Sequence, residues 1–297
     1  MKTNNASYYW SNSVLHLVKR RSHPLINKNS KLEGERVRQA ELKCHGTLIY
    51  QLFRRDLSER YQGTVLGFAW LVVQPLFMLA LYTLVFSEVL QIRFNAQTSN
   101  SHFAFYVFTG LLVFNALSEV LTRSTHVITE RRDLLLNTAL PSWVLPIIPV
   151  TVSVILELVS LSVLLLALSL TQQLQLLGIL FYLPFLLVRI LFSLAAAYSL
   201  AVLGVFLRDL RHLIPALLTV LLFISPILYP SELIPESLGA LYHWNPLAHL
   251  VEAYRLALLQ GQFDLERISA LLLVSSTCWL AAYLLFQSLM PRARYVL

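Results

Sequence analysis

The sequence predicts an all-α polytopic membrane protein with six transmembrane helices. Three observations lead to this fold class: several long apolar runs, a low content of charged residues, and basic residues that gather in alternate segments between the runs. A transmembrane helix needs about 20 mainly apolar residues to cross a hydrocarbon core about 30 Å thick. The runs that approach or exceed this length cover residues 64–90, 103–121, 143–170, 174–207, 213–229 and 268–289.

The composition of the 297-residue chain agrees with this fold class. Hydrophobic residues make up 57% of the chain and charged residues only 13%, whereas a soluble globular protein has about 25% charged residues. Residues 1–63 are polar and contain no apolar core of a signal peptide, so we expect the first run itself to direct insertion. Cys44 and Cys278 lack metal-site spacing and the eight histidines are scattered, so no metal site is predicted.

The distribution of charge predicts the topology. The net charge of +7 originates in residues 1–63, which hold 12 of the 23 Lys and Arg residues. We interpret this segment as a cytoplasmic tail that obeys the positive-inside rule, rather than as a nucleic-acid-binding arm. Basic residues in the second and fourth loops and at Arg292 and Arg294 then place both termini in the cytoplasm. We interpret the run 174–207 as one span, about 51 Å long as a straight helix. Splitting it into two spans would place Arg292 and Arg294 outside the cytoplasm.

The chain divides into a basic cytoplasmic arm (1–45), an amphipathic interface helix (46–63) and a six-helix membrane domain (64–297). The interface helix either anchors the chain to anionic lipid or binds a partner or an anionic headgroup. Gly63 and Gly67 form a G-x-x-x-G pair of the kind that permits close helix packing. Proline and Asn-Pro break the outer segment 230–267 into pieces too short to span, which predicts re-entrant or interfacial helices before the last span.

Two ionisable residues, Glu157 and Arg189, lie deep within neighbouring predicted spans. The short connection between these spans places the two side chains at similar depth, and a charge in the bilayer core is costly unless it is paired or faces water. Either they form an intramembrane ion pair that holds the helices together, or Arg189 faces a path and contacts an anionic substrate. Glu119, near the inner end of the second span, is interpreted as structural.

Aromatic residues are dense in the first two spans. They form either an interfacial belt or the lining of a channel along which sugar rings stack. The candidate channel-lining residues are Trp70, Tyr82, Phe86, Phe105, Tyr106 and Phe108.

Signatures of enzymes and nucleotide-binding loops are absent from the sequence. It contains no G-x-x-x-x-G-K-[ST], G-x-S-x-G or H-E-x-x-H pattern. We therefore predict a chain that is not an enzyme and binds no cofactor itself. Energy for any transport would come from a partner or from an ion gradient.

Residues 52–90 resemble the opening of the type-2 permeases of ABC transporters that export bacterial surface polysaccharides. In that family an interface helix leads to an R-Y-x-x-x-x-L-G-x-x-W-x-x-x-x-P-L pattern. The matching residues are Arg60, Tyr61, Leu66, Gly67, Trp70, Pro75 and Leu76. Later landmarks follow in the family's order at residues 108–124, 207–218, 225–230 and 245–261.

The resemblance implies a homodimer of six-span subunits that works with two copies of a separate ATPase, on which ATP and Mg²⁺ bind. It implies export of an undecaprenyl-diphosphate-linked polysaccharide such as O-antigen across the bacterial inner membrane, from cytoplasm to periplasm. Export of teichoic acid or a drug is an alternative with the same fold. An ion-coupled secondary transporter and a membrane glycosyltransferase are further alternatives, and the latter lacks a D-x-D motif here.

The resemblance also assigns roles to charged residues in the inner segments. The expected ATPase-coupling residues are Glu130, Arg131, Arg132, Asp133, Leu134, Arg208, Asp209 and Arg211. The expected gate residues, which would meet the lipid pyrophosphate, are Arg54, Arg55, Arg60, Arg131 and Arg132. Arginine suits that anion because charge-assisted hydrogen bonds to phosphate are strong. Residues 230–262 would cap the exit as periplasmic re-entrant helices.

Overall fold

The computed structural model describes residues 50–85, 101–137, 141–230 and 244–297, together with Gly46, Gly239 and Tyr242. Residues 51–297 form one compact unit, which contains the apolar helices. No residue among those described lies in a β-strand. The basic arm lies outside the described residues, so the division of the chain at residues 45 and 63 stays a prediction.

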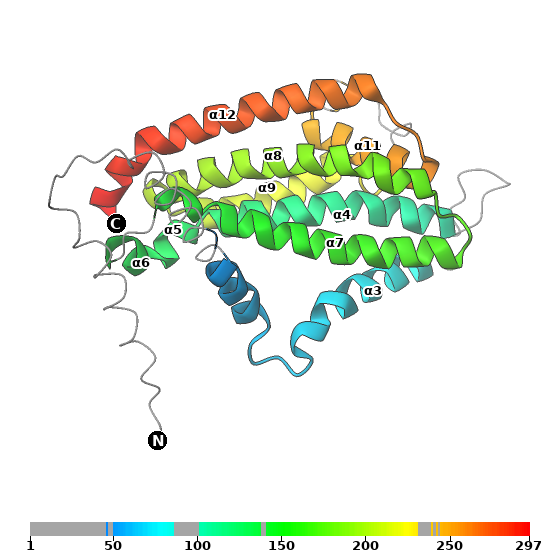
Figure 1. Cartoon of the computed structure of the whole chain (residues 1–297), viewed down its shortest axis with the longest axis horizontal. Helices are drawn as coiled ribbons and strands as arrows, with labels where there is room; N and C mark the ends of the chain where they lie inside the picture. The colour runs from blue at the N-terminus through cyan, green and yellow to red at the C-terminus, as the bar shows by residue number, and fades with distance from the viewer. Residues whose placement is uncertain are drawn as a thin grey trace, which may run out of the picture. The chain divides into compact units, whose positions relative to one another are not determined.

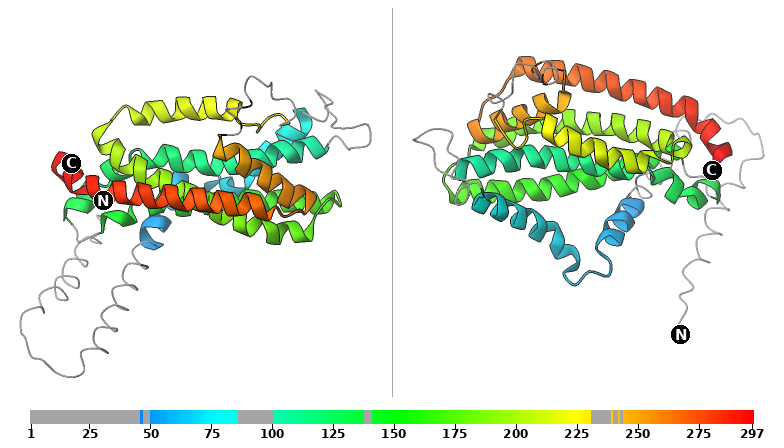
Figure 2. Two further views of the ribbon diagram at one scale, coloured as in Figure 1. Left: turned by 90° about the horizontal axis from the view of Figure 1, so that it is seen from above. Right: turned by 180° about the vertical axis from the view of Figure 1, so that it is seen from behind.

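A bundle of long apolar helices forms the body of this unit. Its members are α4 (Ser101–Ser124), α7 (Ile147–Leu170), α8 (Leu176–Phe206), α9 (Leu210–Ile224) and α12 (Leu265–Val296). The first four run side by side, and α12 lies along α8 (Figures 1 and 2). Within the described residues, four helices are long and apolar enough to span a membrane, whereas α9 and α3 (Trp70–Thr83) are apolar but shorter. The predicted all-α multi-pass class is confirmed, while the count of six spans stays a prediction.

Helix α8 is one continuous helix of 31 residues, as the sequence predicts, although Pro184 lies within it. Two glycines allow close contacts near its ends. A Cβ atom at Gly178 would lie 2.3 Å from the carbonyl oxygen of Ala257, and one at Gly204 would lie 2.0 Å from that of Thr125. No side chain fits at either position without displacing backbone, so glycine is required for the packing of α8 at both ends.

The helix of the first span begins at Trp70, later than the predicted start of the span at residue 64. Gly63 and Gly67 have φ values of 79° and 52°, in the left-handed region that glycine adopts without strain. A Cβ atom at either position would meet nothing within 4 Å. The prediction that these glycines form a helix-packing pair is therefore wrong. They lie in the turn that joins the interface helix (residues 51–61) to α3, at the bottom of Figure 1.

Helix α11 (Pro246–Gln260) has well-defined ends. Asn245 accepts a hydrogen bond from the Leu247 amide at 3.0 Å, and Gly261 ends the helix with a φ of 64°. Its 15 residues extend about 22 Å, too short to cross a membrane. It lies near the opposite end of the bundle from α5 (Val127–Glu130) and α6 (Arg132–Asn137) (Figure 1). Residues 231–238 lie outside the described residues, and the re-entrant path stays a prediction.

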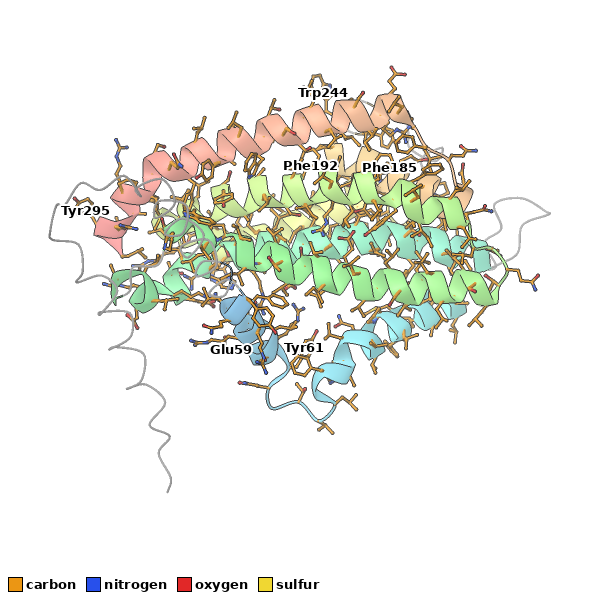
Figure 3. The ribbon with its side chains drawn as sticks, viewed as in Figure 1. Glu59, Tyr61, Phe185, Phe192, Trp244 and Tyr295 are labelled. Carbon is orange, nitrogen blue, oxygen red and sulfur yellow. The ribbon has the colours of Figure 1, made fainter. Side chains whose placement is uncertain are left out.

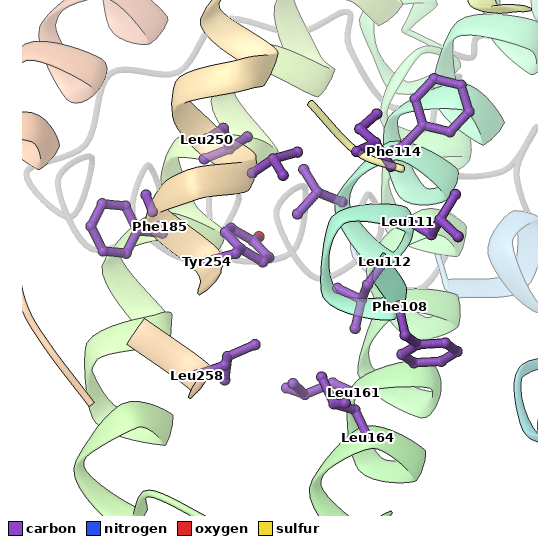
Figure 4. Close-up of a cluster of buried hydrophobic side chains, with 14 of the residues drawn as sticks. Phe108, Leu111, Leu112, Phe114, Leu161, Leu164, Phe185, Leu250, Tyr254 and Leu258 are labelled. Carbon is purple, nitrogen blue, oxygen red and sulfur yellow. The ribbon is translucent and has the colours of Figure 1, made fainter. Parts of the chain in front are cut away.

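The apolar core lies between α4, α7, α8 and α11. Figure 4 shows side chains of these helices that meet there, among them Phe108, Leu161, Phe185, Leu250 and Tyr254. Helices α3, α8, α9 and α12 also keep many large apolar side chains exposed. Such surfaces suit contact with lipid or with another apolar protein surface.

Candidate functional site

A pocket of about 1290 Å³ lies between the interface helix, α3, α4, the α5–α6 segment and α7. Its wall changes character along its length. Charged residues of the interface helix and the α5–α6 segment line one part, and amides and hydroxyls of the bundle helices line the next. Apolar and aromatic side chains, including Met78, Tyr82 and Phe108, line the remainder. The pocket thus offers contacts to charged, polar and apolar groups of a single ligand.

The charged part of the pocket is organised around Asp56 of the interface helix, which is 8% exposed. Its two carboxylate oxygens accept hydrogen bonds from Arg123 at 2.8 Å and from Arg131 at 2.5 Å. Arg123 lies near the end of α4, and Arg131 lies between α5 and α6. One carboxylate therefore joins three segments that are far apart in the sequence.

A second carboxylate completes the same cluster. Glu119 of α4 pairs with Arg60 of the interface helix and with Arg123, whose Nε lies 2.9 Å from it. Arg55 and Glu59 form a more exposed pair at 2.6 Å on the interface helix, which Figure 3 locates by Glu59 and Tyr61. We call Asp56, Arg60, Glu119, Arg123 and Arg131 the charged cluster.

Burial and ion pairing change the pKa values of Arg60 and Arg131 in opposite directions. Burial lowers the pKa of Arg131, and the neighbouring Asp56 carboxylate offsets part of that effect. For Arg60, burial has the largest single effect and lowers the pKa, but the hydrogen bond to Glu119 and the nearby charges of Glu119 and Asp56 together outweigh it, so the net pKa is raised. Both guanidinium groups remain charged, because arginine is not deprotonated in proteins.

The middle of the pocket is polar although it lies among apolar helices. Asn115, Ser118 and Thr122 follow one another on one face of α4 at helical spacing, and all line the pocket. Gln74 of α3 and Ser160 of α7 line it as well. Uncharged amides and hydroxyls of this kind can form hydrogen bonds with the hydroxyl groups of a sugar.

The buried pair Glu157–Arg189 lies at the side of the pocket formed by α7. The structure places these two side chains in an ion pair, each with 0% side-chain exposure. Tyr182 of α8 and Tyr254 of α11 donate hydrogen bonds to Glu157 Oε1 at 3.0 and 2.8 Å. Arg189 also donates to Ser153 at 2.8 Å. We call these residues the buried network, which connects α7, α8 and α11.

The five expected gate arginines differ in their surroundings. Arg55, Arg60 and Arg131 line the pocket, and each is paired with a carboxylate. Arg54 and Arg132 are exposed and form no ion pair among the described residues. As far as the described residues show, an anion could therefore bind Arg54 and Arg132 without displacing a carboxylate, whereas it would compete with one at the other three.

The expected ATPase-coupling residues lie in two exposed segments. Glu130, Asp133 and Leu134 also line the pocket, and Glu130 lies 3.6 Å from His126. Arg208, Asp209 and Arg211 are exposed at the junction of α8 and α9. Both segments lie at the same end of the bundle as the C-terminus of α12 (Figure 1).

The candidate channel aromatics do not form one surface. Tyr82 and Phe108 line the pocket, while Phe105 is 4% exposed within the core. The ring of Tyr106 is covered by the guanidinium of Arg255, whose Cζ lies 3.4 Å from the ring centre. Trp70 is 39% exposed and is not part of the pocket wall, and Phe86 lies outside the described residues.

Asp56 and Arg123, and the ion pairs that connect the charged cluster, escaped the sequence-based prediction. Asp56 and Arg60 are four residues apart on one helix, and Glu119 and Arg123 are four residues apart on another. Two such pairs of opposite charge indicate faces that can meet, which is a signal the sequence carried. No local pattern marks Arg255, because its partners are backbone carbonyl groups.

The fold and the pocket together define a multi-pass helical membrane protein with a charged and polar pocket among its helices. The chain belongs to the family described as ABC-2 type transporter, whose pattern matches residues 47–259. It is 30% identical over 251 residues to the O-antigen export system permease protein RfbA of Myxococcus xanthus, covering 84% of this chain and 94% of that protein.

Two further relatives carry related names. The O-antigen export system permease protein RfbA of Klebsiella pneumoniae is 23% identical over 84% of this chain and 95% of its own length. The polysialic acid transport protein KpsM of Escherichia coli is 26% identical over 71% of this chain and 80% of its own length. All three names describe the export or transport of an antigen or polysaccharide.

Proposed function

We propose that this chain is the permease subunit of an ATP-driven exporter that moves an O-antigen-like polysaccharide, linked to undecaprenyl diphosphate, from the cytoplasm to the periplasm. The observation that carries the proposal is the similarity, over 84% of the chain, to an O-antigen export permease. The pocket supports it, because its charged, polar and apolar parts suit the pyrophosphate, the sugars and the prenyl chain of such a substrate.

The proposed complex contains two copies of this chain and two copies of a separate ATPase in the bacterial inner membrane, with both termini in the cytoplasm. ATP and Mg²⁺ would bind on the ATPase. The exposed segments at Glu130–Leu134 and at Arg208–Arg211 lie at one end of the bundle, which supports a shared docking face. The α11 end would then face the periplasm.

We assign the lipid pyrophosphate to the arginines that line the charged end of the pocket and to the two exposed arginines of the same segments. Arg54 and Arg132 would make the first contact, since neither is paired among the described residues. Arg55, Arg60 and Arg131 would bind only after exchanging a carboxylate partner. The polar face of α4 would then contact the sugars by hydrogen bonds, as amide and hydroxyl groups commonly do.

The test is transport in proteoliposomes that contain a purified complex of this chain and its ATPase. A fluorescent lipid-linked polysaccharide on one side should reach the other side only when the ATPase and ATP are both present. Movement of the glycan without the ATPase, or under an ion gradient alone, would overturn the proposal. A drug or a teichoic acid polymer, supplied in parallel, distinguishes the alternatives with the same fold.

A matched pair of variants tests the pocket itself. Asn115→Leu removes an amide from the polar face of α4, and we expect it to reduce transport about tenfold while basal ATP hydrolysis continues. Thr277→Val removes a hydroxyl from α12, outside the pocket, where it donates hydrogen bonds to backbone carbonyl groups of its own helix. Equal transport by both variants would show that the sugars do not pass along α4.

A further inference from the structure

Helix α9 ends within the bundle, and its end leaves backbone groups that need partners. It has 15 residues, about 22 Å, which is shorter than a hydrocarbon core. The chain leaves the helix at Ser225, with ψ of 143°, and continues through Pro226 and Ile227. Ser225 and Ile227 have 0% exposure, so water does not satisfy these backbone groups. Unpaired carbonyl groups are costly at such a position.

Arg255 of α11 supplies the partners for this broken helix end. It is 2% exposed, and its Nη1 and Nη2 donate hydrogen bonds to the carbonyl oxygens of Pro226 and Ile227 at 2.7 and 2.8 Å. Its Nε donates to the carbonyl oxygen of Tyr106 in α4 at 3.2 Å. The planar guanidinium therefore joins three separate segments with three hydrogen bonds.

Two further contacts hold the same place together. The guanidinium lies over the ring of Tyr106, a cation–π arrangement that adds to its hydrogen bonds. Asn245, at the start of α11, donates a hydrogen bond to Ser225 Oγ at 2.8 Å. A Cβ atom at Gly110 would lie 2.9 Å from Arg255 Nη2 and 3.3 Å from Ile227, so α4 contributes a glycine where the arginine passes.

We propose that Arg255 is a positioning residue that joins the end of α9, the facing part of α4 and α11 into one body, which moves as a unit during transport. The proposal rests on the proposed function for its role in export, but the joining of the three segments does not depend on the substrate. Lysine cannot replace this arginine, because a single ammonium nitrogen cannot reach three carbonyl groups in a planar fork.

The first test measures distances between spin labels in the full-length chain bound to its ATPase, with Cys44 and Cys278 replaced by serine. One label pair reports the joined segments, at the exposed positions Phe223 of α9 and Gln260 of α11. A control pair lies at Leu166 of α7 and Leu180 of α8, two exposed positions on helices other than α9 and α11. We expect the α9–α11 distance to stay the same with and without ATP.

The variant Arg255→Lys should broaden the α9–α11 distance distribution about twofold and leave the α7–α8 distribution unchanged. An α9–α11 distance that changes when ATP binds the wild-type complex would overturn the proposal. Should Arg255→Lys fail to fold, Gly110→Ala and Tyr106→Leu disturb the same contacts more mildly. Broadening in either variant supports the proposal, and unchanged distributions in both overturn it.

Transport gives a second measurement that a residue needed only for folding would not change. In folded Arg255→Lys complexes, we expect glycan transport to fall about tenfold while ATP hydrolysis continues, because segments that are out of position no longer hold the substrate in the orientation that transport needs. Equal loss of both activities with unchanged label distances would overturn the positioning role. If the wild-type complex moves no glycan, the proposed function fails, whereas the distance measurements still decide whether Arg255 joins the three segments.

Discussion

The buried network and the charged cluster use the same kinds of residues in two different environments. In the buried network, the side chains of Glu157 and Arg189 have 0% exposure, and two tyrosines and a serine form hydrogen bonds with them. In the charged cluster, side-chain exposure ranges from 10% at Asp56 to 31% at Arg123. The two regions thus differ in access to water more than in chemistry.

This difference decides what each region can do. Breaking a buried pair leaves an uncompensated charge in a medium of low dielectric constant, which is strongly destabilising. An ion pair in contact with water contributes little, because water and salt compete with it. The buried network therefore holds α7, α8 and α11 in one arrangement. The charged cluster can exchange partners, and it lies where the interface helix meets α4 and the α5–α6 segment.

The largest effect is expected when one partner of the buried pair is removed. Arg189→Met should lower the free energy of unfolding by about 3–5 kcal/mol, because Glu157 would stay buried without its cation. The double variant Glu157→Leu/Arg189→Met, which leaves no charge, should lose less. The measurement is thermal unfolding of the purified chain in detergent. A double variant that is less stable than Arg189→Met would mean that an unpaired Glu157 is not what destabilises the chain.

Loss of a single tyrosine hydroxyl from the buried network should have a smaller effect. Tyr254→Phe removes a hydrogen bond to a carboxylate and should cost about 1.5–3 kcal/mol of unfolding free energy. Tyr198→Phe is the matched control, since Tyr198 donates to the neutral carbonyl of Trp143 at 3.1 Å and should cost about 1 kcal/mol. Equal losses in the same unfolding assay would argue that the charge of Glu157 does not strengthen the contact.

The two regions also differ in how far the sequence predicted them. Glu157 and Arg189 stand out as charges in apolar runs, and the short turn between their helices places them at equal depth, so their pairing was one of two interpretations the sequence offered. Tyr254 could not be added, because the position of α11 against α7 depends on tertiary packing over a separation of 97 residues. The helical runs themselves were predictable, since apolar length alone identifies them.

The charged cluster was not predicted as a unit for a related reason. Asp56 and its partners Arg123 and Arg131 are 67 and 75 residues apart in the sequence. Each charge, seen alone, reads as a solvated residue at a membrane surface. The turn at Gly63 and Gly67 was also misread, because spacing does not reveal whether a glycine serves packing or a positive φ. Features that depend on the pattern within one helix could therefore be predicted from the sequence, whereas contacts between distant helices could not.

A third prediction concerns the close contact of α8 with the turn between α4 and α5. In an exposed helix, Gly→Ala is stabilising by about 1 kcal/mol. At Gly204 the new Cβ would lie 2.0 Å from the carbonyl oxygen of Thr125, so we expect Gly204→Ala to destabilise the chain by about 1–3 kcal/mol. Unfolding in detergent measures the change. A stabilised variant would mean that this end of α8 can move away from the α4–α5 turn at little cost.

The smallest effect on stability, and the most informative one for transport, is expected at Asp56. Asp56→Asn removes the charge from two part-buried ion pairs but keeps an oxygen that can accept a hydrogen bond, so the unfolding midpoint should change less than in Arg189→Met. Glu59→Gln is the matched control on the same helix, because within the described residues the ion pair of Glu59 is with Arg55 of its own helix. If the cluster transmits movement between the interface helix and the α5–α6 segment, Asp56→Asn should reduce ATP-dependent transport severalfold more than Glu59→Gln. The difference in transport between Asp56→Asn and Glu59→Gln should become smaller as the salt concentration in the assay is raised, because salt screens the same ion pairs in the wild-type chain. A large loss of stability with normal transport would instead show that Asp56 serves to stabilise the fold. The charged cluster would then be as rigid as the buried network.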